Sequence, residues 1–74
     1  MITINLDDNF SNEFFNLMNS HSDNVDNLHF LGSIFYFSND ELSYLIKVEK
    51  EHLARLFDLI SENSSLKKLV HEYC

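Results

Sequence analysis

The best candidates for nucleophilic or metal chemistry are three side chains in the C-terminal third of the chain. His71 and Cys74 are three residues apart, a spacing that places both on one helical turn, and His52 could supply a third group. A reactive thiolate is favoured at a helix N-terminus, whereas Cys74 would follow a helix C-terminus, whose partial charge is negative. We therefore expect no catalytic residue, no metal site and no cofactor, and we do not expect an enzyme.

Other sites for ions or phosphates are also unsupported by the sequence. Asp23 and Asp26 offer oxygen ligands, but a calcium loop needs a glycine at its turn and a closing glutamate, and both are missing here. Gly32 is the only glycine, which excludes a glycine-rich phosphate loop. The aromatic residues are not interleaved with Lys or Arg, as they are in platforms that stack nucleic-acid bases.

Charge is distributed very unevenly along the chain. The formal net charge is −7; residues 1–46 carry seven acids and no Lys or Arg, whereas residues 47–74 carry five acids and five bases. A field of one sign disfavours nucleic acid or anionic lipid as a direct ligand and favours a basic protein partner, although solubility alone would also explain it. The acids expected to face that partner are Asp7, Asp8, Glu13, Asp23, Asp26, Asp40 and Glu41.

The first half of the chain predicts a strand and a helix. Residues 2–6 alternate apolar and polar side chains, which is typical of a short half-buried strand, and one of the three residues 7–9 should cap the following helix. That helix has an apolar stripe with Phe15 beside it, and residues 19–27 should form a loop. The stripe consists of Phe10, Phe14, Leu17 and Met18.

Residues 28–37 are the most hydrophobic run, and we interpret them as a strand with two apolar faces. Gly32 in its middle suggests a bulge or the close approach of another backbone. Because one layer of helices covers only one face of a sheet, the other face or a sheet edge should form a homodimer or bind a partner. The expected apolar interface residues are Phe30, Leu31, Phe35 and Phe37.

Residues 42–48 have two interpretations. As a strand they form a hairpin with the preceding run; alternatively, residues 39–62 form one long helix and the protein is mostly α. We prefer the strand, because the long helix would place Glu49 inside its apolar stripe and leave only two strands. A helix should then extend to Asn63, where a left-handed residue would close it, and a last short helix should follow.

The predicted fold is a single α+β domain over residues 1–74, with the order strand, helix, strand, strand, helix, helix. Its three-stranded sheet should be mainly antiparallel, with the helices on one face. One cysteine, no signal peptide and no apolar run near the about 18 residues of a membrane span indicate a cytoplasmic protein that does not contact membranes.

The function that these features favour is non-catalytic protein binding. The hypothesis is a small acidic inhibitor, immunity or anti-defence protein that occludes a basic nucleic-acid-binding partner. The alternative is a structural or assembly subunit that dimerises or docks through the apolar strand 28–37.

Overall fold

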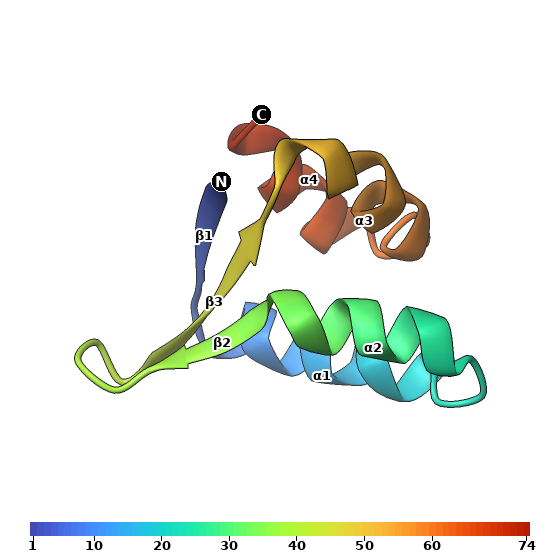
Figure 1. Ribbon diagram of the computed structural model, residues 1–74. Coiled ribbons are helices and arrows are strands. Elements are labelled where there is room, and N and C mark those ends of the chain that lie inside the picture. The colour runs from blue at the N-terminus through green and yellow to red at the C-terminus, as the bar shows by residue number, and fades with distance from the viewer.

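The computed structural model describes residues 1–74 and has an α+β fold of three strands and four α-helices. The predicted fold class and the three-stranded antiparallel sheet are confirmed. Figure 1 shows the β2–β3 hairpin projecting beyond the helices. In chain order the elements are β1 (Ile2–Leu6), α1 (Asp8–Ser20), α2 (Val25–Ile34), β2 (Phe35–Ser38), β3 (Ser43–Val48), the 3₁₀ turn η1 (Lys50–His52), α3 (Leu53–Leu59) and α4 (Ser64–Glu72).

The sheet has the strand order β1-β3-β2, so β3 is central and both other strands are edges. Ile46 of β3 pairs with Ile4 on one side and with Phe35 on the other. Because side chains alternate between faces, the even-numbered residues of β1 and β3 share one face with the odd-numbered residues of β2. Ile4 and Ile46 on this face are fully buried, whereas Thr3 and Lys47 on the opposite face are exposed.

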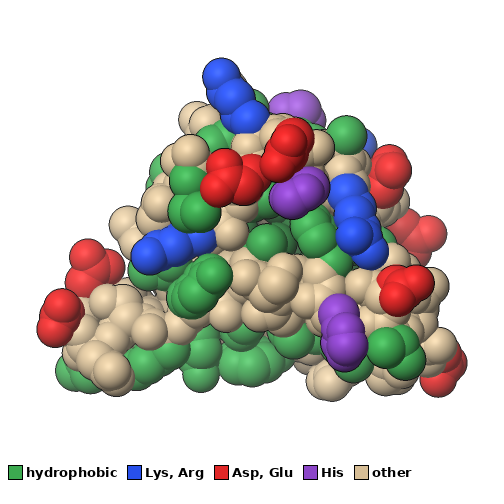
Figure 2. All heavy atoms as spheres, in the orientation of Figure 1, with side chains coloured by type: hydrophobic (Ala, Val, Ile, Leu, Met, Phe, Trp, Pro, Cys, Tyr) green, Lys and Arg blue, Asp and Glu red, His purple; other side chains and the backbone are tan.

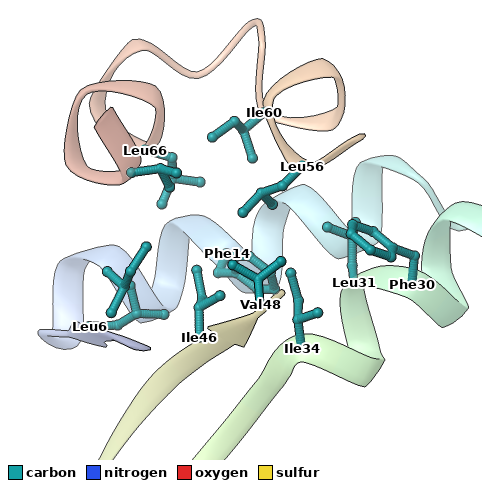
Figure 3. Packing of buried hydrophobic residues seen from close by; sticks show 12 residues of the cluster. Leu6, Phe14, Phe30, Leu31, Ile34, Ile46, Val48, Leu56, Ile60 and Leu66 are labelled. Atoms are coloured by element: carbon teal, nitrogen blue, oxygen red, sulfur yellow. The ribbon is translucent and has the colours of Figure 1, made fainter. Parts of the chain in front are cut away.

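The core lies between that face of the sheet and the helices. It is a cluster of twelve buried residues to which β1, β3 and every helix contribute, so the helices cover one face of the sheet, as predicted. Figure 3 shows Leu56 and Leu66, from α3 and α4, pointing across the core toward Ile46. Burial of each side chain of this size stabilises the fold by about 1.5–3 kcal/mol.

Helix α1 begins where the sequence predicted. Asp7 is its N-cap, and the carboxylate accepts a hydrogen bond from the backbone N–H of Phe10 at 2.8 Å. Phe14 of the predicted stripe is fully buried, and the other three stripe residues pack against the core. The helix extends to Ser20, so the connection to the next element is shorter than the predicted loop.

The predicted strand over residues 28–37 is wrong for most of its length, because residues 25–34 form helix α2 and only residues 35–38 form a strand. Asn24 caps α2 by accepting a hydrogen bond from the backbone N–H of Asn27 at 3.1 Å. Leu31 and Ile34 are three residues apart and both buried, which is helical spacing. Gly32 is neither at a bulge nor against another backbone: a Cβ built there would lie 3.9 Å from the Cε of Met18.

The second half of the chain confirms the strand interpretation of residues 42–48 and excludes the long helix over residues 39–62. β3 spans Ser43–Val48, and η1 and α3 follow it as a separate helical segment. Asn63 does not close α3 in a left-handed conformation; its φ is −104°, and it is the N-cap of α4. None of the helices combines the length and apolarity needed to cross a membrane.

Candidate functional site

Five aromatic rings stack between α1 and the β2–β3 hairpin. The centroid of Phe35 lies 4.6 Å from that of Phe14 on one side and 4.7 Å from that of Tyr44 on the other. Phe15 meets Phe35 and Tyr44 edge-on at 5.0 and 5.2 Å, and Phe37 meets Tyr44 at 5.0 Å. Such ring pairs contribute about 0.5–1.5 kcal/mol each beyond the area they bury, so the rings fix one another in place.

The stack runs from the core to the surface. Phe14 is fully buried, Phe35 and Tyr44 are half-buried, and Phe15 and Phe37 are 41% and 48% exposed. We call the three outermost rings, those of Phe15, Phe37 and Tyr44, the aromatic patch. Phe37 is exposed because the hairpin carries the inner face of the sheet beyond the helices that cover the rest of that face (Figure 1).

Two pairs of acids lie on the hairpin-turn side of the row that pairs Leu6, Tyr44 and Phe37. Tyr44 is paired with Leu6, and Asp7 and Asp8 follow Leu6 directly. Phe37 and Ser38 end β2, and Asp40 and Glu41 follow them in the hairpin turn. All four acids are exposed, and Figure 2 shows acidic side chains at the hairpin end of the molecule next to an edge rich in hydrophobic side chains.

The Lys or Arg nearest to the aromatic patch along the paired strands lies on the opposite face of the sheet. Lys47 belongs to the outer face, where its Nζ lies 5.4 Å from the ring centroid of Tyr36. The inner face of the two hairpin strands therefore carries exposed aromatic rings and no Lys or Arg, and two acids lie in the turn that joins the strands. This arrangement suits a partner that presents apolar and cationic groups together.

The other three predicted acids lie away from the aromatic patch. Glu13 lines a groove of 540 Å³ between α1 and the α3–α4 turn, together with Asp58 and Glu62. Asp23 follows α1 and Asp26 lies in the first turn of α2, both at the end of α1 opposite its N-cap, a helix length of about 20 Å away. The seven acids therefore do not form one surface.

The predicted apolar interface is corrected in two of its four residues. Leu31 is fully buried and Phe30 nearly so, because both face the core from α2 and neither belongs to a strand. Phe35 lies inside the aromatic stack and Phe37 is exposed in the aromatic patch. Sequence reasoning did not assign Phe15 or Tyr44 to the surface, although the position of Phe15 beside the helix stripe was a signal for it.

The structure does not bring His52, His71 and Cys74 together. His71 lies against Phe57, with ring centroids 4.5 Å apart, while His52 lies edge-on to Phe30. The Sγ of Cys74 donates to a backbone oxygen within its own helical turn. No group of three or more His, Cys, Asp or Glu side chains in residues 1–74 is arranged to hold a metal ion.

A second hollow lies between α2 and α3 and is lined by one arginine, one aspartate and two histidines. Arg55 donates from Nη2 to the backbone oxygen of Asp26 at 3.2 Å, and its guanidinium carbon lies 4.5 Å from the ring centroid of Phe30. We call this the Arg55 hollow; it is lined by Asp26, His29, Phe30, Ser33, His52 and Arg55.

Comparison of the chain with known proteins found no protein-family model, no curated protein sequence and no solved structure that matches it.

Proposed function

We propose that the protein is a small non-catalytic module that binds a basic protein surface through the aromatic patch and the acidic pairs Asp7–Asp8 and Asp40–Glu41. The observation that carries this proposal is a set of stacked aromatic rings on a hairpin face without Lys or Arg, with exposed acids in the hairpin turn and directly after β1. The net charge of −7 gives the whole molecule the sign that such a partner would attract.

The two components of the surface would contribute differently to binding. Aromatic side chains at the centre of an interface supply most of its affinity, because they bury a large area and lose few rotatable bonds. Acids at the rim mainly accelerate association with a basic partner and make that rate sensitive to salt. The aromatic patch should therefore set the dissociation rate and the acidic pairs the association rate.

Proteins that bind nucleic acids are a class of partner that fits this surface. Their binding grooves are basic because they neutralise phosphates, so an acidic module can cover the same residues. We propose an inhibitor, immunity or anti-defence protein that occludes such a groove and does not itself bind nucleic acid. Cys74 is free and unpaired, which suits action in a reducing compartment such as the cytoplasm.

The role of the aromatic patch is tested by comparing Phe37→Ser with Tyr73→Ser. Phe37 and Tyr73 are 48% and 44% exposed, but Tyr73 lies at the end of α4 and outside the patch. Immobilised wild type, F37S and Y73S are incubated at low salt with an extract of the source organism, and each captured protein is then purified and its affinity measured. A partner that binds wild type and Y73S and loses most of its affinity for F37S supports the proposal; one that binds all three equally contradicts it.

The role of the acidic pairs is tested by two charge reversals of equal size. Asp40→Lys with Glu41→Lys changes the hairpin turn, whereas Asp23→Lys with Asp26→Lys makes the same change in net charge away from the aromatic patch. Association rates with the purified partner are measured at nanomolar protein concentration and low salt. The hairpin reversal should slow association more, and equal effects would mean that only the total charge matters.

A further inference from the structure

We propose that two copies of this chain pair antiparallel along the free edge of β2, forming a six-stranded sheet around a two-fold axis. The pairing goes beyond the proposed function, since it needs no basic partner. It is inferred from three observations: the composition of β2, its unpaired backbone, and the positions of the hairpin acids and the Arg55 hollow relative to that edge.

The free edge of β2 lacks the features that keep sheet edges apart. Edge strands in native proteins are usually blocked by a charged side chain, a proline or a bulge. β2 has the sequence Phe-Tyr-Phe-Ser, and no Lys, Arg, Asp or Glu occurs from Asn27 to Asn39. Tyr36 and Phe37 are 46% and 48% exposed on opposite faces, so a strand added to this edge would gain apolar contacts above and below the sheet.

The backbone of β2 is also available for pairing. β2 is bonded to β3 on one side only. Residues 36–38 make no backbone hydrogen bond outside that ladder. A second β2 would therefore find unpaired donors and acceptors along this edge, which is the geometry of strand addition.

Charge decides the direction of pairing. Directly opposed residues of an antiparallel pair lie on the same face, so the two-fold axis passes between a residue and its own copy, here Tyr36. Ser38 then lies about 7 Å from the axis at 3.3–3.4 Å per residue, and the turn that carries Asp40 and Glu41 follows it. On the other copy, α2 continues from β2 away from the hairpin (Figure 1). After about 7 Å of strand, the helical rise of 1.5 Å per residue places Ser33 at about 8 Å and His29 at about 14 Å from the axis.

The acids of each hairpin turn would thus come level with the Arg55 hollow of the other copy, because Ser33 and His29 line that hollow. Arg55 is the only Lys or Arg in it. A parallel pairing would instead bring the two acidic turns together, where like charges repel. The antiparallel arrangement also puts both aromatic patches on the same face of one sheet, which would give a partner two adjacent binding surfaces.

The test uses two variants that should each dimerise weakly alone and should dimerise with each other when they are mixed. Glu41→Lys would place a cation opposite Arg55 in a homodimer, and Arg55→Glu would place two acids opposite each other. In a heterodimer of E41K with R55E, each of the two contacts between a hairpin turn and an Arg55 hollow joins a cation to an acid. Glu72→Lys, on the exposed end of α4, makes the same change in net charge as E41K and is the matched control.

Sedimentation equilibrium of the full chain is measured from about 10 µM to about 1 mM, since a small interface between two chains of net charge −7 should be weak. We expect wild type and E72K to dimerise, and each of E41K and R55E to associate about tenfold more weakly. An equimolar mixture of E41K and R55E should regain the dimerisation that each has lost. A wild type that stays monomeric over this range, or a mixture that associates no better than its components, would overturn the proposal. Circular dichroism of each variant establishes that the fold is unchanged.

Discussion

Replacing Gly32 with alanine should stabilise the protein, and the size of the effect follows from the position of Gly32 in α2. Glycine is about 0.8–1.0 kcal/mol less favourable than alanine inside a helix, because its backbone loses more freedom on folding. Gly32 has no positive φ, and a Cβ there would meet only the Cε of Met18 at 3.9 Å, which is ordinary contact. Since Gly32 lies in the last turn of α2, we expect a gain of about 0.5–1 kcal/mol.

Urea denaturation followed by circular dichroism measures this gain, and Gly32→Val serves as the comparison. With a slope near 1 kcal/mol/M for a protein of this size, G32A should raise the midpoint by about 0.5–1 M. In a helix valine is less favourable than alanine, whereas in a strand it is more favourable, so the order of stability should be Ala, then Val, then Gly. A G32V protein more stable than G32A, or a G32A protein less stable than wild type, would refute the helical placement of residue 32.

Three further predictions test other features of the structure by the same denaturation assay. Leu42 is 77% exposed with φ of 52°, so Leu42→Asn should stabilise by about 0.5–1 kcal/mol while Leu42→Ala, equally strained, should not. Asn63→Ala removes the side-chain acceptor 2.9 Å from the backbone N–H of Leu66 and should cost about 1 kcal/mol; no loss would mean that this cap is unimportant. Phe14→Ala should cost about 3–5 kcal/mol, against about 1–1.5 kcal/mol for Phe37→Ser, and similar losses would contradict the graded burial of the stack.

The elements that could be predicted from the sequence are those whose signals are local. The alternation over residues 2–6 specifies β1. Asp7 caps α1, because its carboxylate accepts a hydrogen bond from the backbone N–H three residues later. The strand at residues 43–48 could be predicted from packing, since a helix there would bury Glu49. In the structure Glu49 is exposed, between β3 and η1.

Helix α2 could not be identified from periodicity because its surroundings are too apolar. Phe35 and Phe37 continue the hydrophobic run past the end of the helix, so apolar residues occupy both helical and alternating positions. Asn24 was the available signal, since it precedes the run as a good N-cap and bonds the N–H of Asn27. It was obscured by the many other Asn, Ser and Asp residues around it, which also favour turns.

The candidate site was predictable in composition but not in position. Phe37 and the hairpin acids stand together in the sequence, but Phe15 and Asp8 join them through the pairing of Leu6 with Tyr44, a contact between distant segments. Helix periodicity places Phe15 beside a stripe without saying what lies opposite. The missing information was therefore the strand register that pairs Leu6 with Tyr44 and the packing of α1 that brings Phe15 against Tyr44.

The aromatic patch is continuous with the core, and this has a consequence for binding. Phe14 is held by the core, Phe35 and Tyr44 stack on it in turn, and the exposed rings rest on Tyr44. A surface ring supported in this way has little rotational freedom left to lose when a partner covers it, and that loss costs a mobile side chain about 0.5–1.5 kcal/mol. Substitution of Phe35 should therefore weaken binding through the freed rings of Phe15 and Phe37, even where the partner does not touch residue 35.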